Sequence, residues 1–185
     1  MFLYHYFDIK KGPFLNLSAF GISEAIKIQN EIVQNKIGFA AYRNSGYIER
    51  RIELEKIAYN IFTEKGGKPK SKFPHYFVIE ECKWLETWYE NAGYVKCNIE
   101  NFDINELSFT YGDLFPTFSD KINDKKEYRK KVYTYDEILK IIDKYGFPQD
   151  WNTEGLKGPE RYIEAHYWNN NIRKILENCT YKNNS

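Results

Sequence analysis

The spacing of apolar residues along the chain predicts amphipathic helices separated by short strands. Apolar side chains recur every three or four residues in four segments, which predicts helices at 22–33, 47–65, 81–89 and 135–144. Gly66 and Gly67 give a stop signal for the second of these helices. Thr134 and Glu137 form a capping-box pattern that opens the last one.

Segments rich in aromatic and β-branched residues predict strands at 2–8, 75–80, 94–99, 107–111 and 161–168. An Asn- and Asp-containing segment separates the third from the fourth, which favours an antiparallel pair between these two. Several strands follow one another without an intervening helix, so we expect an α+β fold and not a doubly wound one. The expected architecture is a single domain over 1–185, with a mainly antiparallel mixed sheet of about five or six strands packed by about three or four helices.

Composition indicates a folded chain without one dominant charge. The 185 residues include 27 Lys+Arg and 26 Asp+Glu, giving a net charge of +1, which argues against a disordered tail or a strongly basic nucleic-acid surface. Basic clusters at 65–72 and 125–131 are interpreted as solvated loops, so nucleic acid is an unlikely partner. Arg43, Arg50 and Arg51 could clamp an anionic ligand, but they lie near several glutamates, which favours a surface ion-pair network.

The cysteines and the first residues bear on the cellular compartment. Cys82, Cys97 and Cys179 lack CxxC spacing, which predicts neither a disulfide framework nor a thiolate zinc site and favours a reducing cytoplasm. Neither H-x-H nor H-E-x-x-H occurs, and no metal is expected. Met1 is followed by aromatic residues without a basic region or a long apolar run, so we expect no signal peptide and no membrane span.

The segment 162–168 is the most informative one for chemistry. Strand alternation places four side chains on one face, Tyr162, Glu164, His166 and Trp168, and three on the other, Ile163, Ala165 and Tyr167. A carboxylate and an imidazole two residues apart on a strand can share a ligand or a proton. The alternative is a hydrogen-bonded Glu–His pair beneath a loop.

Three residues outside this segment complete the candidate catalytic set: His5, His75 and Asp113. His5 shares a predicted strand face with apolar residues, so it is either a satisfied core histidine or an active-site one. His75 begins a predicted strand, a position from which side chains reach a cleft. Asp113 ends a strand in a Gly-Asp turn, where it acts as a base, positions a ribose-like hydroxyl or only satisfies the turn geometry.

These residues lead to the hypothesis of an aromatic-walled polar pocket for a small molecule. With aromatic residues at 18% of the chain, such a pocket has enough rings for its walls. Glu164 would be a base or cation stabiliser, His166 and His75 proton carriers or ligand donors, and Asp113 an orienting group. The reaction and any cofactor stay open. The alternative from another class is a non-catalytic module that binds nucleic acid or protein.

Several segments together resemble an uncharacterised bacterial hypothetical-protein family over nearly the whole chain. They are LYHYFD with GPFLNLS, KGGKPKSKFPHYFVIEECKWLETWY, LSFTYGDLFPTF, VYTYDEILKIIDKYG and PERYIEAHYW. The resemblance implies a bacterial domain and carries no activity with it.

The motifs LYHYF and RYIEAHYW are also similar to those of ADP-ribosyltransferase-like domains. This similarity implies an NAD-using enzyme in which His5 holds the nicotinamide nucleotide and Glu164 stabilises the oxocarbenium-like charge as nicotinamide leaves. Tyr42 or Tyr76 would stack on the ring. The chain departs from that pattern because no H-G-[ST] follows the first strand and no Ser-Thr-Ser element is present.

Overall fold

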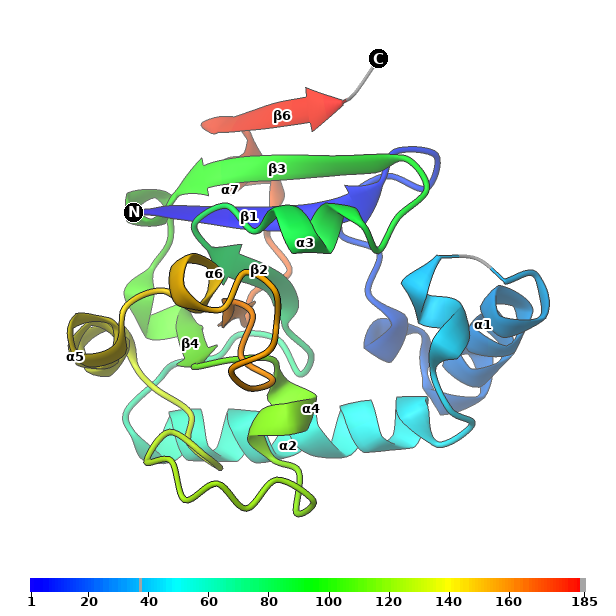
Figure 1. Ribbon diagram of the computed structural model, residues 1–185. Coiled ribbons are helices and arrows are strands. Elements are labelled where there is room, and N and C mark those ends of the chain that lie inside the picture. Colours follow the sequence, from blue (N-terminus) through cyan, green and yellow to red (C-terminus); the bar gives the residue numbers. More distant parts are fainter. Residues whose placement is uncertain (37, 184–185) are drawn as a thin grey trace.

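The computed structural model describes residues 1–36 and 38–183, and its centre is one antiparallel sheet (Figure 1). The strands are β1 (Phe2–Asp8), β2 (His75–Ile79), β3 (Ala92–Asn98), β4 (Leu107–Thr110), β5 (Ile163–Tyr167) and β6 (Cys179–Asn183). They are arranged in the order β4-β5-β2-β1-β3-β6. The predicted α+β class and the strand-rich segments are therefore confirmed.

Three longer helices and several single turns surround the sheet. The longer helices are α1 (Ile22–Gln34), α2 (Tyr47–Glu64) and α5 (Tyr135–Tyr145). The short turns are η1 (Leu17–Phe20), η2 (Phe39–Tyr42), α3 (Lys83–Glu86), η3 (Ile99–Asn101), η4 (Ile104–Glu106), α4 (Leu114–Thr117), α6 (Pro148–Trp151) and α7 (Arg173–Leu176). The capping box of α5 is confirmed, since the Thr134 backbone N–H donates to Glu137 Oε2 at 2.9 Å.

Two predictions of local structure are wrong. The helix expected at 81–89 is only the single turn α3, because the Thr87 hydroxyl donates to the Trp84 carbonyl at 2.7 Å and competes with continuation of the helix. The expected pairing of 94–99 with 107–111 does not form. β3 instead lies between β1 and β6, whereas β4 pairs with β5 at the opposite side of the sheet.

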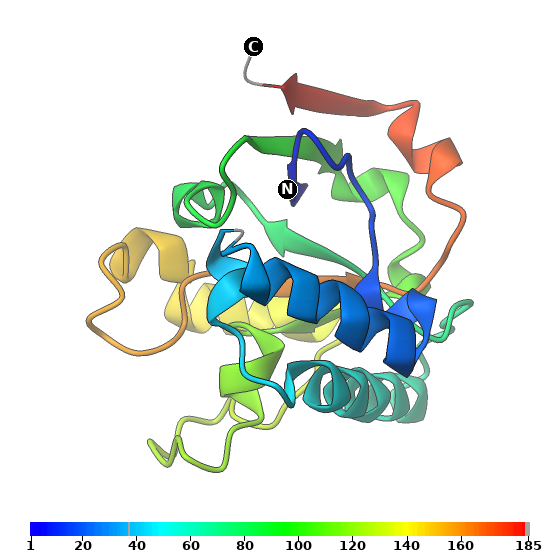
Figure 2. The ribbon, with the colours of Figure 1, turned by 90° about the vertical axis from the view of Figure 1, so that its right-hand side faces the viewer.

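The two faces of the sheet are covered by different helices (Figures 1 and 2). One face carries the main apolar core, which includes Ile163, Ala165 and Tyr167 of β5 and is closed by α5. The other face meets α2 through Trp168 and meets α3 through Tyr4. The predicted division of β5 into a core face and a polar face is confirmed. Between the areas covered by α2 and α3, this second face is left open to a cavity.

α1 lies apart from the sheet. It packs against η1, η2 and α2, and stands beside the open part of the second sheet face (Figure 2). Among the residues described, no helix has both the length and the apolar composition needed to cross a lipid bilayer.

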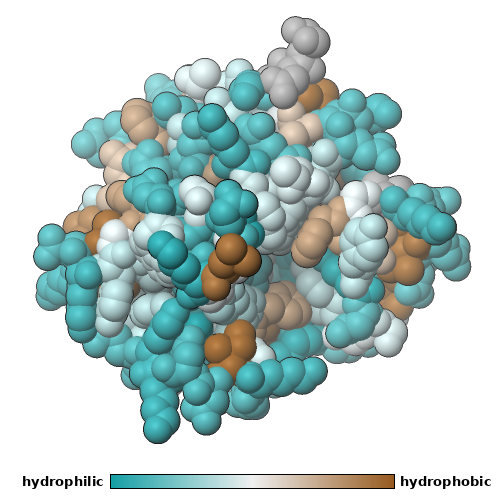
Figure 3. All heavy atoms as spheres, viewed as in Figure 1, coloured by the Kyte–Doolittle hydropathy of each residue, from teal (hydrophilic) through white to brown (hydrophobic). Residues whose placement is uncertain are grey.

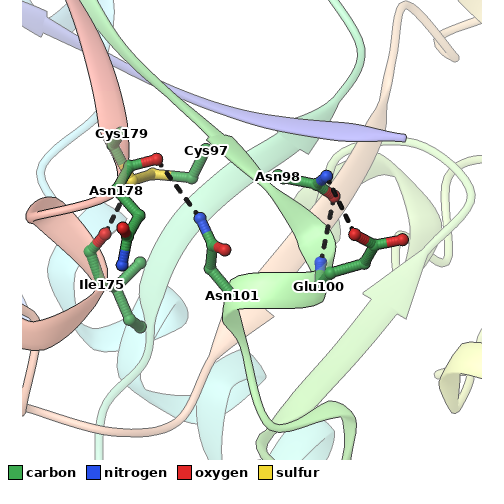
Figure 4. The surroundings of a disulfide bond; sticks show 7 residues. All are labelled: Cys97, Asn98, Glu100, Asn101, Ile175, Asn178 and Cys179. Atoms are coloured by element: carbon green, nitrogen blue, oxygen red, sulfur yellow. Dashed lines mark hydrogen bonds between the residues drawn. A yellow bond between two sulfur atoms is a disulfide. The ribbon is translucent and has the colours of Figure 1, made fainter.

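A disulfide joins Cys97 of β3 to Cys179 of β6 (Figure 4). The two residues are direct partners in the antiparallel register, with their Cα atoms 4.5 Å apart. The expectation of no disulfide is therefore wrong. The cysteines are separated by 82 residues, and only the β3–β6 pairing brings them together. Cys82 is free and buried.

Removal of this disulfide is expected to lower the free energy of unfolding by about 2–4 kcal/mol, because the cross-link restricts the unfolded chain over a long loop. The measurement is urea denaturation of the Cys97→Ser/Cys179→Ser variant beside the wild type. Cys82→Ala is the control, since it leaves the cross-link intact. Equal unfolding midpoints with and without a reductant would contradict the expectation.

Candidate functional site

A cavity of about 640 Å³ occupies the open part of the second sheet face. Tyrosines of the sheet form its floor: Tyr4, Tyr6, Tyr76 and Tyr162. Its sides include Trp84, Trp88 and Tyr89 around α3, and Phe39, Tyr47 and Phe115 from η2, α2 and α4. The space-filling view shows this side of the molecule hollowed between α1 and the body of the protein (Figure 3). The volume lies within the range typical of small-molecule sites.

The aromatic walls are held in place by contacts within the protein. Tyr6 Oη accepts a hydrogen bond from the Cys82 backbone N–H at 2.8 Å, and Phe39 stacks on Trp88 with ring centroids 4.3 Å apart. Gly38 allows this stack, because it adopts φ 55° and a Cβ there would lie 2.5 Å from the Trp88 carbonyl oxygen. The walls are therefore formed before any ligand binds.

Glu164 lies on the cavity face of β5 and is 6% exposed. A buried chain of hydrogen bonds connects Glu164 to His166, Ser108 and Trp168. Glu164 Oε1 is 2.8 Å from His166 Nε2, His166 Nδ1 is 3.2 Å from Ser108 Oγ, and Ser108 Oγ accepts from Trp168 Nε1 at 2.8 Å. Indole N–H only donates, so the arrangement that also uses the Ser108 proton has Ser108 donating to Nδ1 and His166 Nε2–H donating to Glu164.

Burial determines the protonation of this chain. It lowers the pKa of His166 to about 3, so the imidazole is neutral at physiological pH. Burial, together with the nearby Asp113 carboxylate, raises the pKa of Glu164 well above its usual range. Arg51 and the Leu114 backbone N–H oppose this rise. Because Glu164 Oε1 accepts from His166, a proton on Glu164 lies on Oε2. The site thus holds a carboxylic acid that can donate a proton.

The row Ser108–His166–Glu164 resembles a nucleophilic triad only in composition. Ser108 is completely buried and does not line the cavity, and its hydroxyl is engaged by Trp168 and His166. A nucleophile must reach the substrate. His166 is also completely buried, so its effect on a ligand is exerted through the orientation of Glu164.

Asp113 enters the same cavity from the turn that follows β4. Thr110 of β4 is the register partner of Glu164, and Gly112, at φ 113°, turns the chain toward α4. Asp113 caps α4, with Oδ1 accepting from Phe115 N–H at 2.7 Å and Oδ2 accepting from Tyr162 O–H at 2.9 Å. Burial raises the pKa of Asp113, and these two donors oppose the rise. The donors favour the carboxylate form of Asp113 beside the acid form of Glu164.

His5 and His75 lie on the opposite, core-facing side of their strands and reach the cavity where β1 and β2 separate. His5 Nδ1 donates to the Tyr76 carbonyl at 2.7 Å, and its Nε2 accepts from Phe14 N–H at 2.9 Å. Burial lowers the pKa of His5 to about 4 and lowers that of the half-buried His75. The structure therefore groups Glu164, His166 and Asp113, and places the other two histidines apart from them.

A buried polar network beside the cavity was not anticipated. Glu55 of α2 is 1% exposed, and its Oε1 accepts from Arg51 Nε at 2.9 Å, Ser18 Oγ at 2.8 Å and Tyr76 Oη at 2.7 Å. The expectation of a surface network is wrong for Arg51 and Glu55. Their spacing of four residues predicts an ion pair, but only the covering by η1 and β2 buries it.

In the described part of the chain, no group of three or more metal-ligating side chains converges on one point. Comparison with known proteins gives no match to a family model, a curated protein or a solved structure.

Proposed function

We propose that this protein is an enzyme that acts on a small sugar-containing molecule. It cleaves the bond between the anomeric carbon and the leaving group, and the glycosyl group passes to water or to another acceptor. The observation that supports it is the carboxyl pair on the cavity wall, in which Glu164 favours the acid form and Asp113 the carboxylate form. Glycosidic bond cleavage uses such a pair, one group giving a proton to the leaving atom and the other stabilising the positive charge that develops on the sugar.

Glu164 is the proton donor in this proposal, through Oε2. Asp113 faces the oxocarbenium-like charge, and the surrounding tyrosine and tryptophan rings add favourable interactions with a cation and with a flat ligand face. His166 keeps Glu164 oriented by occupying Oε1. The role that the ADP-ribosyltransferase similarity gives Glu164 agrees with this chemistry. The role that it gives His5 does not, because both ring nitrogens of His5 contact backbone.

The alternative of a nucleic-acid-binding module receives less support. Lys70 is paired with buried Glu106, and Lys126 and Arg129 are both paired with buried Glu160. Cations engaged in this way have less charge to offer to phosphates. The cytoplasmic location expected from the sequence stays a prediction, and the disulfide favours an oxidising compartment instead.

The experiment tests p-nitrophenyl glycosides, nucleoside monophosphates and NAD as substrates. Turnover is measured as the release of nitrophenol, base or nicotinamide, respectively. Asp113→Asn is expected to lower kcat by about two orders of magnitude or more, because it removes the charge that faces the transition state. Asp120→Asn is the matched control, since Asp120 is exposed and lies in an ion pair with Lys130. Absence of turnover with all three classes, or full activity of Asp113→Asn, would overturn the proposal.

The pH profile of kcat/KM is expected to be bell-shaped. Activity should fall at low pH as Asp113 gains a proton, with a midpoint above the usual value for aspartate because burial raises its pKa. It should fall again at high pH, as Glu164 loses the proton that its raised pKa retains at neutral pH. Steady-state kinetics over a pH series checks both limbs, and a rate that keeps rising into alkaline solution would contradict the acid role of Glu164.

A further inference from the structure

Arg43 is a half-buried cation on the cavity wall. It follows η2, and its guanidinium carbon lies 4.1 Å from the centroid of the Tyr47 ring. Tyr47 in turn stacks on Phe115 with an interplanar angle of 3° and ring centroids 4.9 Å apart. The guanidinium therefore lies over an aromatic stack, and stacked arginine is a common binder of planar oxyanions.

The charge of Arg43 has no carboxylate partner within 4.0 Å among the residues described. The nearest polar contact is a long one, 3.4 Å from Nη1 to Gln29 Oε1, and Gln29 is itself buried and held by the Ala40 carbonyl. Two neighbouring arginines differ in this respect. Arg50 pairs with Glu53 and Arg51 with Glu55. A guanidinium in a cavity of low polarity attracts an anion more strongly than one in water.

The surroundings of Arg43 indicate what else the ligand carries. Leu15, Phe20 and Phe39 line the cavity and are 61%, 51% and 43% exposed, so large apolar side chains lie open to solvent at its mouth. Ile28 and Ile32 of α1 continue this apolar surface. Exposed apolar side chains grouped around a cavity are typical of binding sites for apolar ligand parts.

We infer that Arg43 is the subsite for a carboxylate or phosphate group of the ligand, whose apolar or aromatic part lies against the mouth formed by η1, α1 and η2. Arg43 and Asp113 line the same cavity, so the anion and the reacting bond would share it. Assigning this ligand to the substrate rests on the proposed function. The substrate would then be an acidic or phosphorylated sugar derivative with an apolar or aromatic portion.

The test uses calorimetric titration of the full chain with three probes of similar shape: 2-naphthoate, 2-naphthyl phosphate and the neutral 2-naphthamide. At least one anion should bind about tenfold or more tightly than the amide, corresponding to about 1.4 kcal/mol. The better anion identifies the group that the subsite prefers. Equal affinity for all three probes, or binding of none, would overturn the inference.

Substitutions locate the anion contact. Arg43→Gln should abolish the preference for the anion, whereas Arg43→Lys should keep part of it because the charge is retained. Arg50→Gln is the control, since Arg50 does not line the cavity and pairs with exposed Glu53. Circular dichroism verifies that each variant is folded. An unchanged preference in folded Arg43→Gln would contradict the assignment.

The outcome is separable from that of the proposed function. Glu164→Gln should keep the anion preference, because it does not alter Arg43. If anions bind through Arg43 but no sugar derivative is turned over, the proposed reaction fails alone. If turnover depends on Glu164 while the probes bind equally, the anion subsite fails alone.

Discussion

Replacing Glu164 with glutamine is expected to lower kcat by about 10²–10⁴-fold, the usual contribution of a general acid. Glutamine has the shape of protonated Glu164, and its carbonyl oxygen accepts the His166 Nε2–H as Oε1 does. It cannot give up a proton to a leaving group. Kinetics on the best substrate found for the wild type measures the loss. Glu53→Gln, an exposed position on α2, is the control and should be fully active.

The same substitution is expected to raise the free energy of unfolding at neutral pH by about 1–2 kcal/mol. Because the folded pKa of Glu164 is raised, the folded protein keeps a proton that the unfolded chain has lost. Its contribution to stability therefore falls as pH rises from the unfolded pKa, about 4.3, toward the folded one. Glutamine does not titrate. The gain in unfolding free energy should therefore appear between the unfolded and folded pKa values of Glu164 and vanish at lower pH.

Urea unfolding of both proteins at acid and neutral pH distinguishes this effect from a general change in packing. A variant that is inactive and also less stable at every pH would indicate that Glu164 is a structural residue. A variant that is active and stabilised would contradict the role of Glu164 as an acid, but it would agree with the raised pKa of Glu164. The loss of activity and the gain in stability therefore test two separate properties of Glu164.

Arg51→Met is expected to cost about 3–5 kcal/mol of unfolding free energy, because it leaves the carboxylate of Glu55 buried without a cation. The loss should be large even though the methionine side chain replaces most of the apolar contacts of arginine. Thermal or urea denaturation measures it. Arg50→Met is the matched control on the same helix, and removal of its partly exposed ion pair should cost less than about 1 kcal/mol.

The double variant Arg51→Met/Glu55→Leu tests the reason for this loss. If the cost comes from an unpaired buried charge, removing Glu55 as well should recover much of the stability. Ser18 and Tyr76 would still lose their acceptor, so recovery should be incomplete. A double variant as unstable as the sum of its parts would indicate that packing, and not charge, makes Arg51 necessary.

Features that repeat within one element could be predicted from the sequence. The spacing in α2 and α5 extends over several turns, and the alternation of β5 correctly separated Glu164 and His166 from Ile163 and Ala165. The single turn α4 has no comparable signal, because four residues are too few to reveal a helical period. The apolar spacing of 81–89 predicts a helix longer than the single turn α3. β6 was missed for a related reason, since its place depends on pairing with β3.

The sequence is sufficient to predict which side chains share a strand face or a helix face, because those relations follow from the local geometry of the backbone. It therefore placed Glu164 beside His166 and divided β5 between core and cavity. Long-range packing brings Asp113 into the cavity with Glu164, covers the Arg51–Glu55 pair and brings Cys97 to Cys179. These relations depend on the strand order and on which element covers each face, and both arise from contacts between residues far apart in the chain.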